Sequence, residues 1–349
     1  MKRPGMIANF AITYRCDSRC RNCNIWRTPD PGRGELTLGE IEGLFEKNMR
    51  FLSGVRSIQI TGGEPFLRGD LPGVTAAIHS SLPRCSFWIP TNGLRPDLVG
   101  EMTEEILEGL DGWGLGVSVS LDGVGETHEA MRGVKGSYSL ALATLESLSR
   151  LRGDYAALKV SVGMTVSADN SGEIARVLEI AKRYSVDFSL RPVNFSDIYY
   201  RNLPASSQLR ATGLVDALRL VARSRVAERG LLRSLPTLRY LQGILDYLRR
   251  PGVRVQACSA GEDSMFLDPH GDVYPCIVVG DRLGNVRESM LEEIWSSTEA
   301  REARTKIKEG QCPGCWVECE SYRDILRDRL GLVRTALRAL ANPRSLGVG

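Results

Sequence analysis

The sequence lacks the features that mark membrane-spanning and secreted proteins. No stretch approaches the roughly 20 consecutive apolar residues that a helix needs to cross a bilayer. The first residues, MKRPG, are basic, but only a short apolar run follows them, and no small-residue cleavage site is present. The sequence therefore predicts a protein that does not span a membrane and is not secreted.

An excess of charge of one sign is also missing. The 349 residues include 45 Lys and Arg and 42 Asp and Glu, which leaves a formal net charge of +3. That excess is too small to indicate a nucleic-acid partner. The hydrophobic content of 42% and the charged content of 25% are ordinary for a globular enzyme, and neither repeats nor low-complexity tracts occur. Composition alone names no partner.

What the sequence does have is nine cysteines, most of them in clusters. Cys16, Cys20 and Cys23 fall within eight residues, directly after an apolar run. Short spacings with no intervening helix allow three sulfurs to turn toward one metal centre. Three protein ligands leave one coordination position open for a small molecule, whereas a structural zinc site has four. A zinc knuckle completed by a distant cysteine and buried unreactive thiols are the alternatives. Clustered cysteines without an export signal fit a reducing cytoplasm.

Up to about residue 192 the sequence alternates short β-rich runs with longer segments of helical period, which is typical of parallel βα units. A helix over 38–51 is expected because Thr37 and Glu40 form a T-x-x-E capping box in front of it. Gly, Asn and Asp follow most of the β-rich runs. The six expected strands span residues 7–13, 55–61, 84–91, 115–121, 158–166 and 187–192.

Six strands are too few for a complete eight-stranded barrel, so we expect an α/β fold with a partial (β/α)6 TIM-like barrel. In such folds the chemistry gathers at the carboxyl ends of the strands. After a connection near 194–204 the chain turns helical and basic, and a second cysteine-rich segment begins at Cys258. The expected organisation is a barrel core over 1–202, a helical connection over 203–257, a cysteine-rich module over 258–320, and an amphipathic helix and tail over 321–349.

The segment 321–341 has the pattern of an amphipathic helix. Its apolar residues recur at helical spacing and its arginines occupy other faces. We expect this helix to pack on its own domain; peripheral contact with a membrane surface or with a partner is the alternative. The apolar residues are Leu326, Leu330, Val333, Leu337 and Leu340, and the arginines are Arg323, Arg327, Arg334 and Arg338.

The C-x3-C-x2-C spacing after a first strand, followed one βα unit later by G-G-E-P at 62–65, resembles the radical S-adenosylmethionine (SAM) superfamily. The resemblance implies that Cys16, Cys20 and Cys23 hold a 4Fe-4S cluster whose fourth iron is chelated by the amino and carboxylate groups of SAM. Electron transfer from the cluster would break a carbon–sulfur bond and release a 5′-deoxyadenosyl radical. The family has an aromatic residue before the third cysteine, where this chain has Asn22.

The same resemblance assigns cofactor contacts to residues at the strand ends. The G-G-E-P run is implied to bind the methionine amino group, since two glycines permit close backbone approach and a carboxylate accepts hydrogen bonds from an ammonium group. Hydroxyl, amide, carboxylate and guanidinium groups close the later strands, although such residues often only cap turns. The implied cofactor-binding residues are Gly62, Gly63, Glu64, Pro65, Asn92, Ser120, Asp122, Thr165 and Arg191.

The second cysteine-rich segment resembles the twitch or SPASM extension of part of this superfamily. An H-x3-R-G pattern at His128, Arg132 and Gly133 is common in that subgroup, with helix capping and a salt bridge as its structural alternative. Residues 268–276 are typical of a tight β-hairpin that presents a thiol. The resemblance implies one auxiliary 4Fe-4S cluster, held by Cys258, Cys276, Cys312 and Cys315.

A fifth cysteine in this segment, Cys319, has no assigned place. Five cysteines are too few for the full SPASM pattern with two auxiliary clusters. Cys319 could replace Cys312 as a ligand, act as a catalytic hydrogen donor to a product radical, or be a spare buried thiol. A zinc ribbon is the alternative for the whole set. Cys85 lies within a strand run, and we expect it in the core.

The implied function is that of a cytoplasmic radical SAM enzyme, of oxidoreductase or transferase type, that abstracts a hydrogen atom from a substrate carbon. Its expected partners are a small-molecule or peptide substrate and a flavodoxin- or ferredoxin-type reductant. Dehydrogenation, epimerisation and bond formation all start from that abstraction, and the sequence does not separate them. The alternatives are a SPASM-type maturase of ribosomally made peptides and a non-catalytic iron–sulfur redox sensor.

Overall fold

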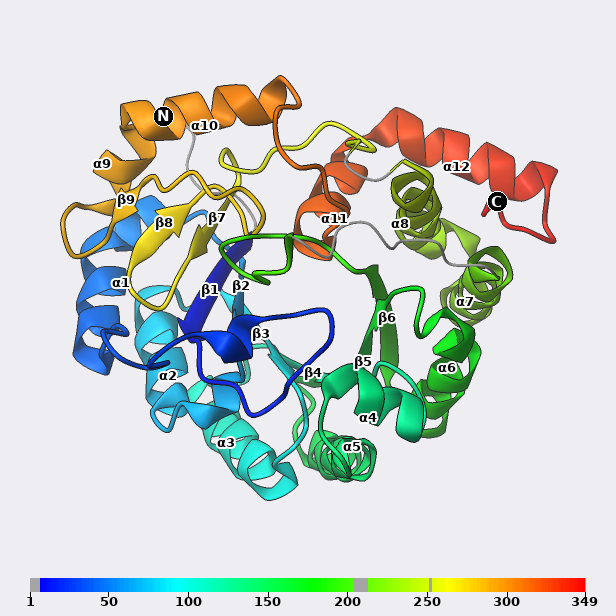
Figure 1. The fold of residues 1–349 in the computed structure, drawn as a ribbon, viewed down its shortest axis with the longest axis horizontal. Helices are drawn as coiled ribbons and strands as arrows, with labels where there is room; N and C mark the ends of the chain where they lie inside the picture. The colour runs from blue at the N-terminus through cyan, green and yellow to red at the C-terminus, as the bar shows by residue number, and fades with distance from the viewer. Residues whose placement is uncertain (1–6, 204–212, 251–252, 349) are drawn as a thin grey trace.

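Six parallel strands form the centre of the computed structural model, which describes residues 7–203, 213–250 and 253–348. The strands lie side by side in sequence order, and each pairs with the next (Figure 1). The expected partial (β/α)6 barrel is confirmed. Its strands are β1 (Ile7–Thr13), β2 (Ser57–Gly62), β3 (Ser86–Thr91), β4 (Leu115–Ser120), β5 (Leu158–Val166) and β6 (Asp187–Pro192).

Helices cover the outer side of these strands (Figure 1). The expected capping box opens α1: Thr37 Oγ1 accepts from the Glu40 N–H at 3.3 Å, and Glu40 Oε2 accepts from the Thr37 N–H at 2.8 Å. The barrel helices are α1 (Leu38–Leu52), α2 (Leu71–Ser81), α3 (Pro96–Gly109), α4 (Glu126–Arg132), α5 (Ser137–Asp154) and α6 (Ile174–Arg183), with short 3₁₀ turns η1 (Ile25–Arg27), η2 (Pro65–Leu67) and η3 (Ser171–Glu173).

The two faces of the barrel strands differ in chemistry. Because side chains alternate along a strand, Phe87 and Ile89 of β3 lie buried in the core beneath the helices. The side chains that alternate with these apolar ones along the strands face inward. This inner face carries small polar groups such as Ser118, Ser161 and Ser189. Complete barrels usually fill this space with branched apolar side chains. Here the small groups leave an inner cavity of about 460 Å³.

The second cysteine-rich segment extends the same sheet. β7 (Ser264–Leu267) pairs in parallel with β1, and β8 (Asp272–Tyr274) returns antiparallel to β7, followed by β9 (Gly284–Asn285). A hairpin is present where one was expected, but it begins earlier, with β7, and ends with β8, two residues before Cys276. The remaining helices are α7 (Leu214–Arg229), α8 (Leu231–Arg249), α9 (Leu291–Ser296), α10 (Thr298–Lys308), α11 (Glu318–Arg327) and α12 (Arg329–Ala341).

Part of the expected organisation concerns residues outside the described ranges. The basic residues 1–6 lie outside the described residues, as do 204–212 and 251–252 of the expected helical connection. Most of the described part of the expected helical connection is indeed helical and forms α7 and α8.

The amphipathic helix expected over 321–341 is divided in two, and its second part packs on its own protein, against α8, as expected. Asp328 separates α11 from α12, and its carboxylate caps α12 by accepting from the Gly331 N–H at 2.8 Å. The buried residues of α12 are small, and Leu332 is half-buried against the core beside them. All five of the apolar residues named from the sequence are exposed: Leu326, Leu330, Val333, Leu337 and Leu340.

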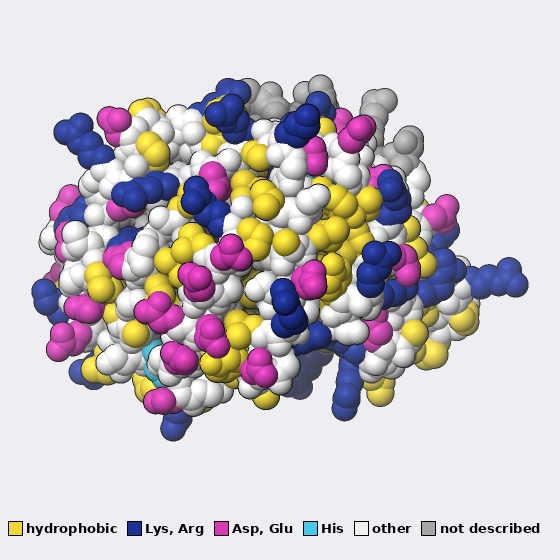
Figure 2. Space-filling model, turned by 90° about the horizontal axis from the view of Figure 1, so that it is seen from below, with side chains coloured by type: hydrophobic (Ala, Val, Ile, Leu, Met, Phe, Trp, Pro, Cys, Tyr) yellow, Lys and Arg dark blue, Asp and Glu magenta, His cyan; other side chains and the backbone are white. Residues whose placement is uncertain are grey.

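The surface carries charges of both signs. On the face shown in Figure 2, Lys and Arg side chains are interspersed with Asp and Glu side chains, in agreement with the small net charge. Among the described residues, no helix has the length and apolar character that a membrane crossing requires.

Candidate active site

The three-cysteine loop, residues 16–23, leaves the end of β1 and docks on the last turn of α4. The backbone N–H of Arg19 donates to the Arg132 carbonyl oxygen at 2.9 Å, and that of Arg21 donates to the Met131 carbonyl oxygen at 3.0 Å. Gly133 then adopts a left-handed conformation with φ of 66°, and a Cβ added there would lie 2.3 Å from the Arg19 carbonyl oxygen. Only glycine fits this contact.

Replacement of Gly133 by alanine should therefore displace the three-cysteine loop. We expect the reconstituted Gly133→Ala protein to lose most of the iron and sulfide of one cluster, measured by chemical analysis and visible absorbance. Gly136→Ala is the matched control: Gly136 also has a positive φ, of 79°, but an added Cβ there has no heavy atom within 4 Å. Each change costs about 1–2 kcal/mol for the backbone conformation. Equal iron loss in both variants would contradict the role given to the loop contact.

The G-G-E-P run lies beside the start of the same loop. The Gly63 N–H donates to the Thr13 carbonyl oxygen, and the Glu64 N–H donates to the Arg15 carbonyl oxygen, each at 2.8 Å. A Cβ added to Gly62 or Gly63 would lie 2.1 Å from one of these two oxygens. The glycines are therefore required by the approach of the loop backbone, a reason that the sequence does not reveal.

Glu64 is a buried carboxylate at the end of β2. Its Oε2 accepts from the Asn92 backbone N–H at 2.6 Å, and its Oε1 accepts from the Phe66 N–H at 3.3 Å. Burial raises the pKa of Glu64 to about 7, although these hydrogen bonds and one from Thr91 lower it. A cationic group of a ligand placed beside this carboxylate would favour its ionised form.

Asp122 at the end of β4 is already engaged through both carboxylate oxygens. Its Oδ1 accepts from the Thr165 N–H at 2.8 Å, and its Oδ2 lies 3.1 Å from Arg132 Nε. Arg132 also donates from Nη1 to the Cys20 Sγ at 3.6 Å, and His128 Nδ1 accepts from the Asp122 N–H at 3.1 Å. Although burial disfavours its charge, the Asp122 carboxylate raises the pKa of Arg132. The H-x3-R-G residues thus connect the three-cysteine loop to β4 and β5.

The cysteines of the loop, Cys319 and all but one of the predicted cofactor-binding residues line one cavity, the upper cavity, of about 180 Å³ at the carboxyl ends of the strands. Pro65 does not line it; this residue is buried at the start of η2. Asn22 does line it, and its carbonyl oxygen accepts from Asn202 Nδ2 at 2.8 Å. The predicted residues on its walls are Cys16, Cys20, Cys23, Gly62, Gly63, Glu64, Asn92, Ser120, Asp122, Thr165, Arg191 and Cys319.

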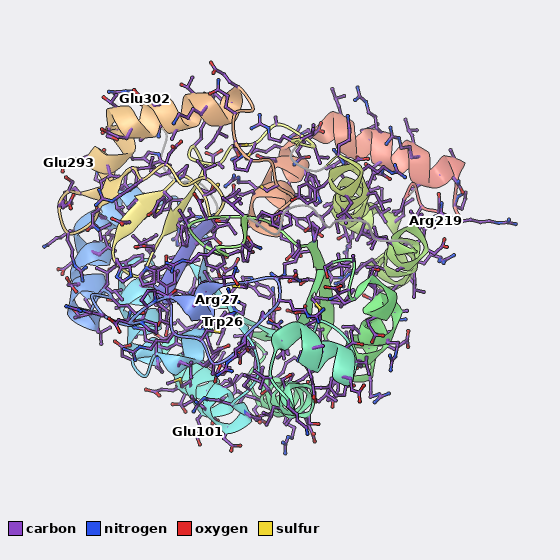
Figure 3. The ribbon with its side chains drawn as sticks, viewed as in Figure 1. Trp26, Arg27, Glu101, Arg219, Glu293 and Glu302 are labelled. Carbon is purple, nitrogen blue, oxygen red and sulfur yellow. The ribbon has the colours of Figure 1, made fainter. Side chains whose placement is uncertain are left out.

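Several wall residues carry no sequence pattern that could have found them. Tyr199 closes the upper cavity from the connection after β6, and its hydroxyl lies 2.5 Å from Thr61 Oγ1. In Figure 3, Trp26 and Arg27 lie near the centre of the view, whereas Glu101, Arg219, Glu293 and Glu302 lie toward the periphery. Trp26 Nε1 donates to the Cys23 carbonyl oxygen at 3.0 Å and so fixes the end of the loop.

A second cavity, the auxiliary cavity, is lined by Cys258, Cys276, Cys312 and Cys315. Backbone N–H groups donate to two of these sulfurs: Ala260 to Cys258 at 3.4 Å, and Val278 and Val279 to Cys276 at 3.5 and 3.4 Å. Burial raises the pKa of Cys258 to about 12 and raises those of Cys276 and Cys315 as well. Thiolates here need a cationic centre nearby.

The donor sets fit iron–sulfur clusters in both places. Three and four thiols, aided by N–H donors to sulfur, suit 4Fe-4S ligation with and without an open iron. Within the described part of the chain, no group of three or more His, Cys, Asp or Glu side chains is arranged to hold a single metal ion. Cys319 lines the upper cavity and not the auxiliary cavity.

Comparison with known proteins decides the family. Residues 10–184, half of the chain, match the Radical SAM superfamily. The chain belongs to the radical SAM superfamily. Residues 258–320 match SPASM, an iron–sulfur cluster-binding domain, so the predicted SPASM subclass is confirmed too. This radical SAM protein is an enzyme that uses SAM and a 4Fe-4S cluster, with further iron–sulfur binding in its SPASM domain.

Relatives of this radical SAM enzyme include the pre-heme d1 synthase of Dinoroseobacter shibae, 25% identical over 89% of this chain and 79% of that protein. The mycofactocin maturase MftC of Mycolicibacterium smegmatis is 28% identical over 88% of this chain and 74% of that one. Streptococcus suis SuiB bound to the precursor peptide SuiA superposes with a TM-score of 0.59 at 16% identity, over 87% of this chain. The chain spans 66% of SuiB, and this likeness shows the shared fold.

Proposed function

We propose that this enzyme abstracts hydrogen from a substrate bound between the three-cysteine loop and the wall formed by Arg191, Glu318 and Cys319. One observation carries the proposal: both groups line the upper cavity, although they come from distant parts of the chain. When bound, the cluster and SAM supply a carbon radical that abstracts hydrogen. The enzyme's own residues then have to bind SAM on one wall and the substrate on the other.

The roles of the residues follow from this placement. Cys16, Cys20 and Cys23 would hold the cluster that binds SAM. Glu64 would accept from the SAM ammonium group, and the side chains of the other strand ends would surround the rest of the cofactor. Asp122 is better placed to fix Arg132 and Thr165 than to contact SAM, since both of its oxygens are engaged. The four cysteines of the auxiliary cavity would hold one auxiliary 4Fe-4S cluster.

The inner cavity of the barrel would accept the body of the substrate. It shares Arg191, Glu318 and Cys319 with the upper cavity, so the two spaces meet at these residues. Arg191 and Glu318 lie 3.6 Å apart, and the buried Arg191 Nε has no hydrogen-bond partner. Burial raises the pKa of Glu318, although Arg191 lowers it. A substrate with a carboxylate or carbonyl group would satisfy the free Arg191 donor.

Cys319 would donate a hydrogen atom to the substrate radical. Burial raises the pKa of its thiol, so the sulfur keeps its hydrogen at neutral pH, and Asn9 Nδ2 donates to the Sγ at 3.6 Å. The transfer would break the S–H bond and form a C–H bond. The resulting thiyl radical would take one electron from the flavodoxin- or ferredoxin-type reductant and one proton from solvent.

Iron analysis separates a donor role for Cys319 from a ligand role. We expect Cys319→Ala to keep the full iron and sulfide content, because its sulfur lines the upper cavity. Cys276→Ala should lose the iron of one cluster. The buried core residue Cys85, changed to alanine, is the control for cysteine removal as such. Loss of iron from Cys319→Ala would contradict the assignment and make Cys319 a ligand.

The function is tested by anaerobic reconstitution with iron and sulfide, followed by SAM and dithionite. We expect 5′-deoxyadenosine in the wild type, detected by mass spectrometry. Intact clusters without any 5′-deoxyadenosine would favour the non-catalytic redox sensor.

A peptide maturase is the second candidate. It is favoured by the similarity to mycofactocin maturase and by the fold shared with SuiB, which was solved with a precursor peptide. A peptide substrate would show a mass change after incubation with the reduced enzyme and SAM, whereas a small-molecule substrate would leave every candidate peptide unmodified.

A further inference from the structure

Helix α12 turns its most apolar face toward solvent. Leu330, Val333, Leu337 and Leu340 are 71, 55, 62 and 64% exposed. Their spacing of three and four residues places them in one ridge along the helix. Leu326 at the end of α11 is exposed as well. The four exposed Leu and Val residues of α12 are the leucine ridge.

The leucine ridge lies opposite the face by which α12 packs. Gly331, Thr335 and Ala339 are buried, and they recur every four residues on the other side of the helix. Their small size lets α12 lie close to α8, and Leu332 is the one large apolar side chain of the helix that packs against the core. Figure 1 shows α12 along the outer edge of the molecule, next to α8. The ridge therefore points away from the protein body.

The charges along α12 beside the leucine ridge are positive, and the one nearby carboxylate, Asp328, caps the start of the helix. Arg329 and Arg334 flank it on its two sides, and Arg338 and Arg344 follow. All four are exposed, and none forms an ion pair within the described residues. No Asp or Glu occurs from residue 329 onward. An apolar ridge between unpaired arginines complements a surface that has anionic groups on its outside and an apolar layer beneath them.

We propose that α12 binds peripherally to an anionic lipid surface. The leucine ridge would enter the boundary between headgroups and acyl chains, while the flanking arginines would reach lipid phosphates with their long side chains. The helix would lie in the plane of the interface, because it is exposed along its whole length. This proposal is independent of the chemistry proposed for the upper cavity.

Other occupants fit the ridge less well. A second copy packed ridge to ridge would bring together two helices whose ridges are both flanked by arginines, and like charges at flanking positions oppose helix pairing. Protein interfaces draw most of their affinity from Trp, Tyr and Arg seated in pockets, whereas Leu and Val are under-represented there. A convex ridge of leucines and one valine at the edge of the molecule suits a planar bilayer better than a protein groove.

Vesicle co-sedimentation of the full chain tests the proposal. We expect binding to vesicles of equal parts phosphatidylglycerol and phosphatidylcholine, and little binding to phosphatidylcholine alone. Leu330→Gln with Leu337→Gln should weaken binding at least about tenfold. Arg334→Gln with Arg338→Gln should weaken it about thirtyfold, at about 1 kcal/mol for each basic residue. Leu232→Gln is the matched control, since Leu232 is 79% exposed and lies outside the ridge.

The expected order of binding is wild type equal to Leu232→Gln, followed by the two double variants. The proposal is overturned if the wild type does not bind anionic vesicles, or if it binds neutral vesicles equally well. A dimer in sedimentation that the Leu330→Gln and Leu337→Gln changes dissolve, without vesicle binding, would assign the ridge to a second copy. A monomer that binds no vesicles would assign it to a protein partner. Thermal unfolding of each variant verifies that it is folded.

Discussion

Replacement of Cys20 by alanine is expected to abolish SAM cleavage while the auxiliary cluster stays in place. Cys20 is one of the three thiols proposed to hold the open cluster, and its Sγ accepts from Arg132. With two thiols remaining, the cluster loses a ligand next to a buried cation. We expect 5′-deoxyadenosine to fall below detection and the iron content to fall to that of a single cluster.

The control for this experiment is removal of a cysteine from the other set, by Cys276→Ala. Cys276 lies in the auxiliary cavity, so its loss should remove the other cluster and leave the SAM-binding cluster assembled. The two variants should therefore retain similar amounts of iron but differ in SAM binding. If both variants lose all iron together, the two cysteine sets do not form separate clusters.

The second large effect is expected from replacement of Glu64 by glutamine. Glutamine in its place can accept from only one of the two backbone N–H groups and offers no charge to the SAM ammonium group. A charge-assisted hydrogen bond contributes about 1.5–3 kcal/mol, so SAM should bind about ten- to a hundredfold more weakly to Glu64→Gln. Equilibrium binding of SAM to the oxidised, reconstituted protein measures this loss of affinity without any turnover.

The pH dependence of SAM binding gives an independent test of Glu64. Because burial raises its pKa to about 7, SAM binding below that pH has to release a proton, and affinity should rise about tenfold per pH unit up to about 7 and then level off. The raised pKa of Glu64 also affects the stability of the folded protein. The folded pKa exceeds the unfolded value of 4.5, so the SAM-free protein should lose stability as pH rises from 4.5 to about 7. Glu64→Gln should remove both dependences.

The barrel could be predicted because its signals are local. Alternating runs separated by helical segments placed all six strands, and the pair Thr37 and Glu40 marked the start of α1. The metal ligands could be proposed for the same reason, since Cys16, Cys20 and Cys23 lie within eight residues. Their assignment to cofactors nevertheless came from resemblance to a family, because spacing alone left zinc as an alternative.

Contacts between distant parts of the chain could not be predicted. β7 pairs with β1 across more than two hundred residues, and nothing in either strand marks the other as its neighbour. Asp122 ends a strand as a cofactor contact would, yet its two oxygens hold Arg132 and the backbone of Thr165.

The leucine ridge of α12 shows a different limit. Helical periodicity established that an apolar face exists, but amphipathicity does not say what covers that face. Packing through Gly331, Thr335 and Ala339 became possible because small residues let the helix approach α8 closely. The residues of the leucine ridge consequently face solvent, whereas the apolar face of a surface helix usually faces the core.

The central claim is that the three-cysteine loop holds an open cluster at which SAM binds beside Glu64, separate from the auxiliary cluster. Electron paramagnetic resonance of the reduced Cys276→Ala protein, with and without SAM, tests it most directly. We predict that the remaining cluster signal shifts on addition of SAM. A remaining signal that SAM leaves unchanged would contradict the claim.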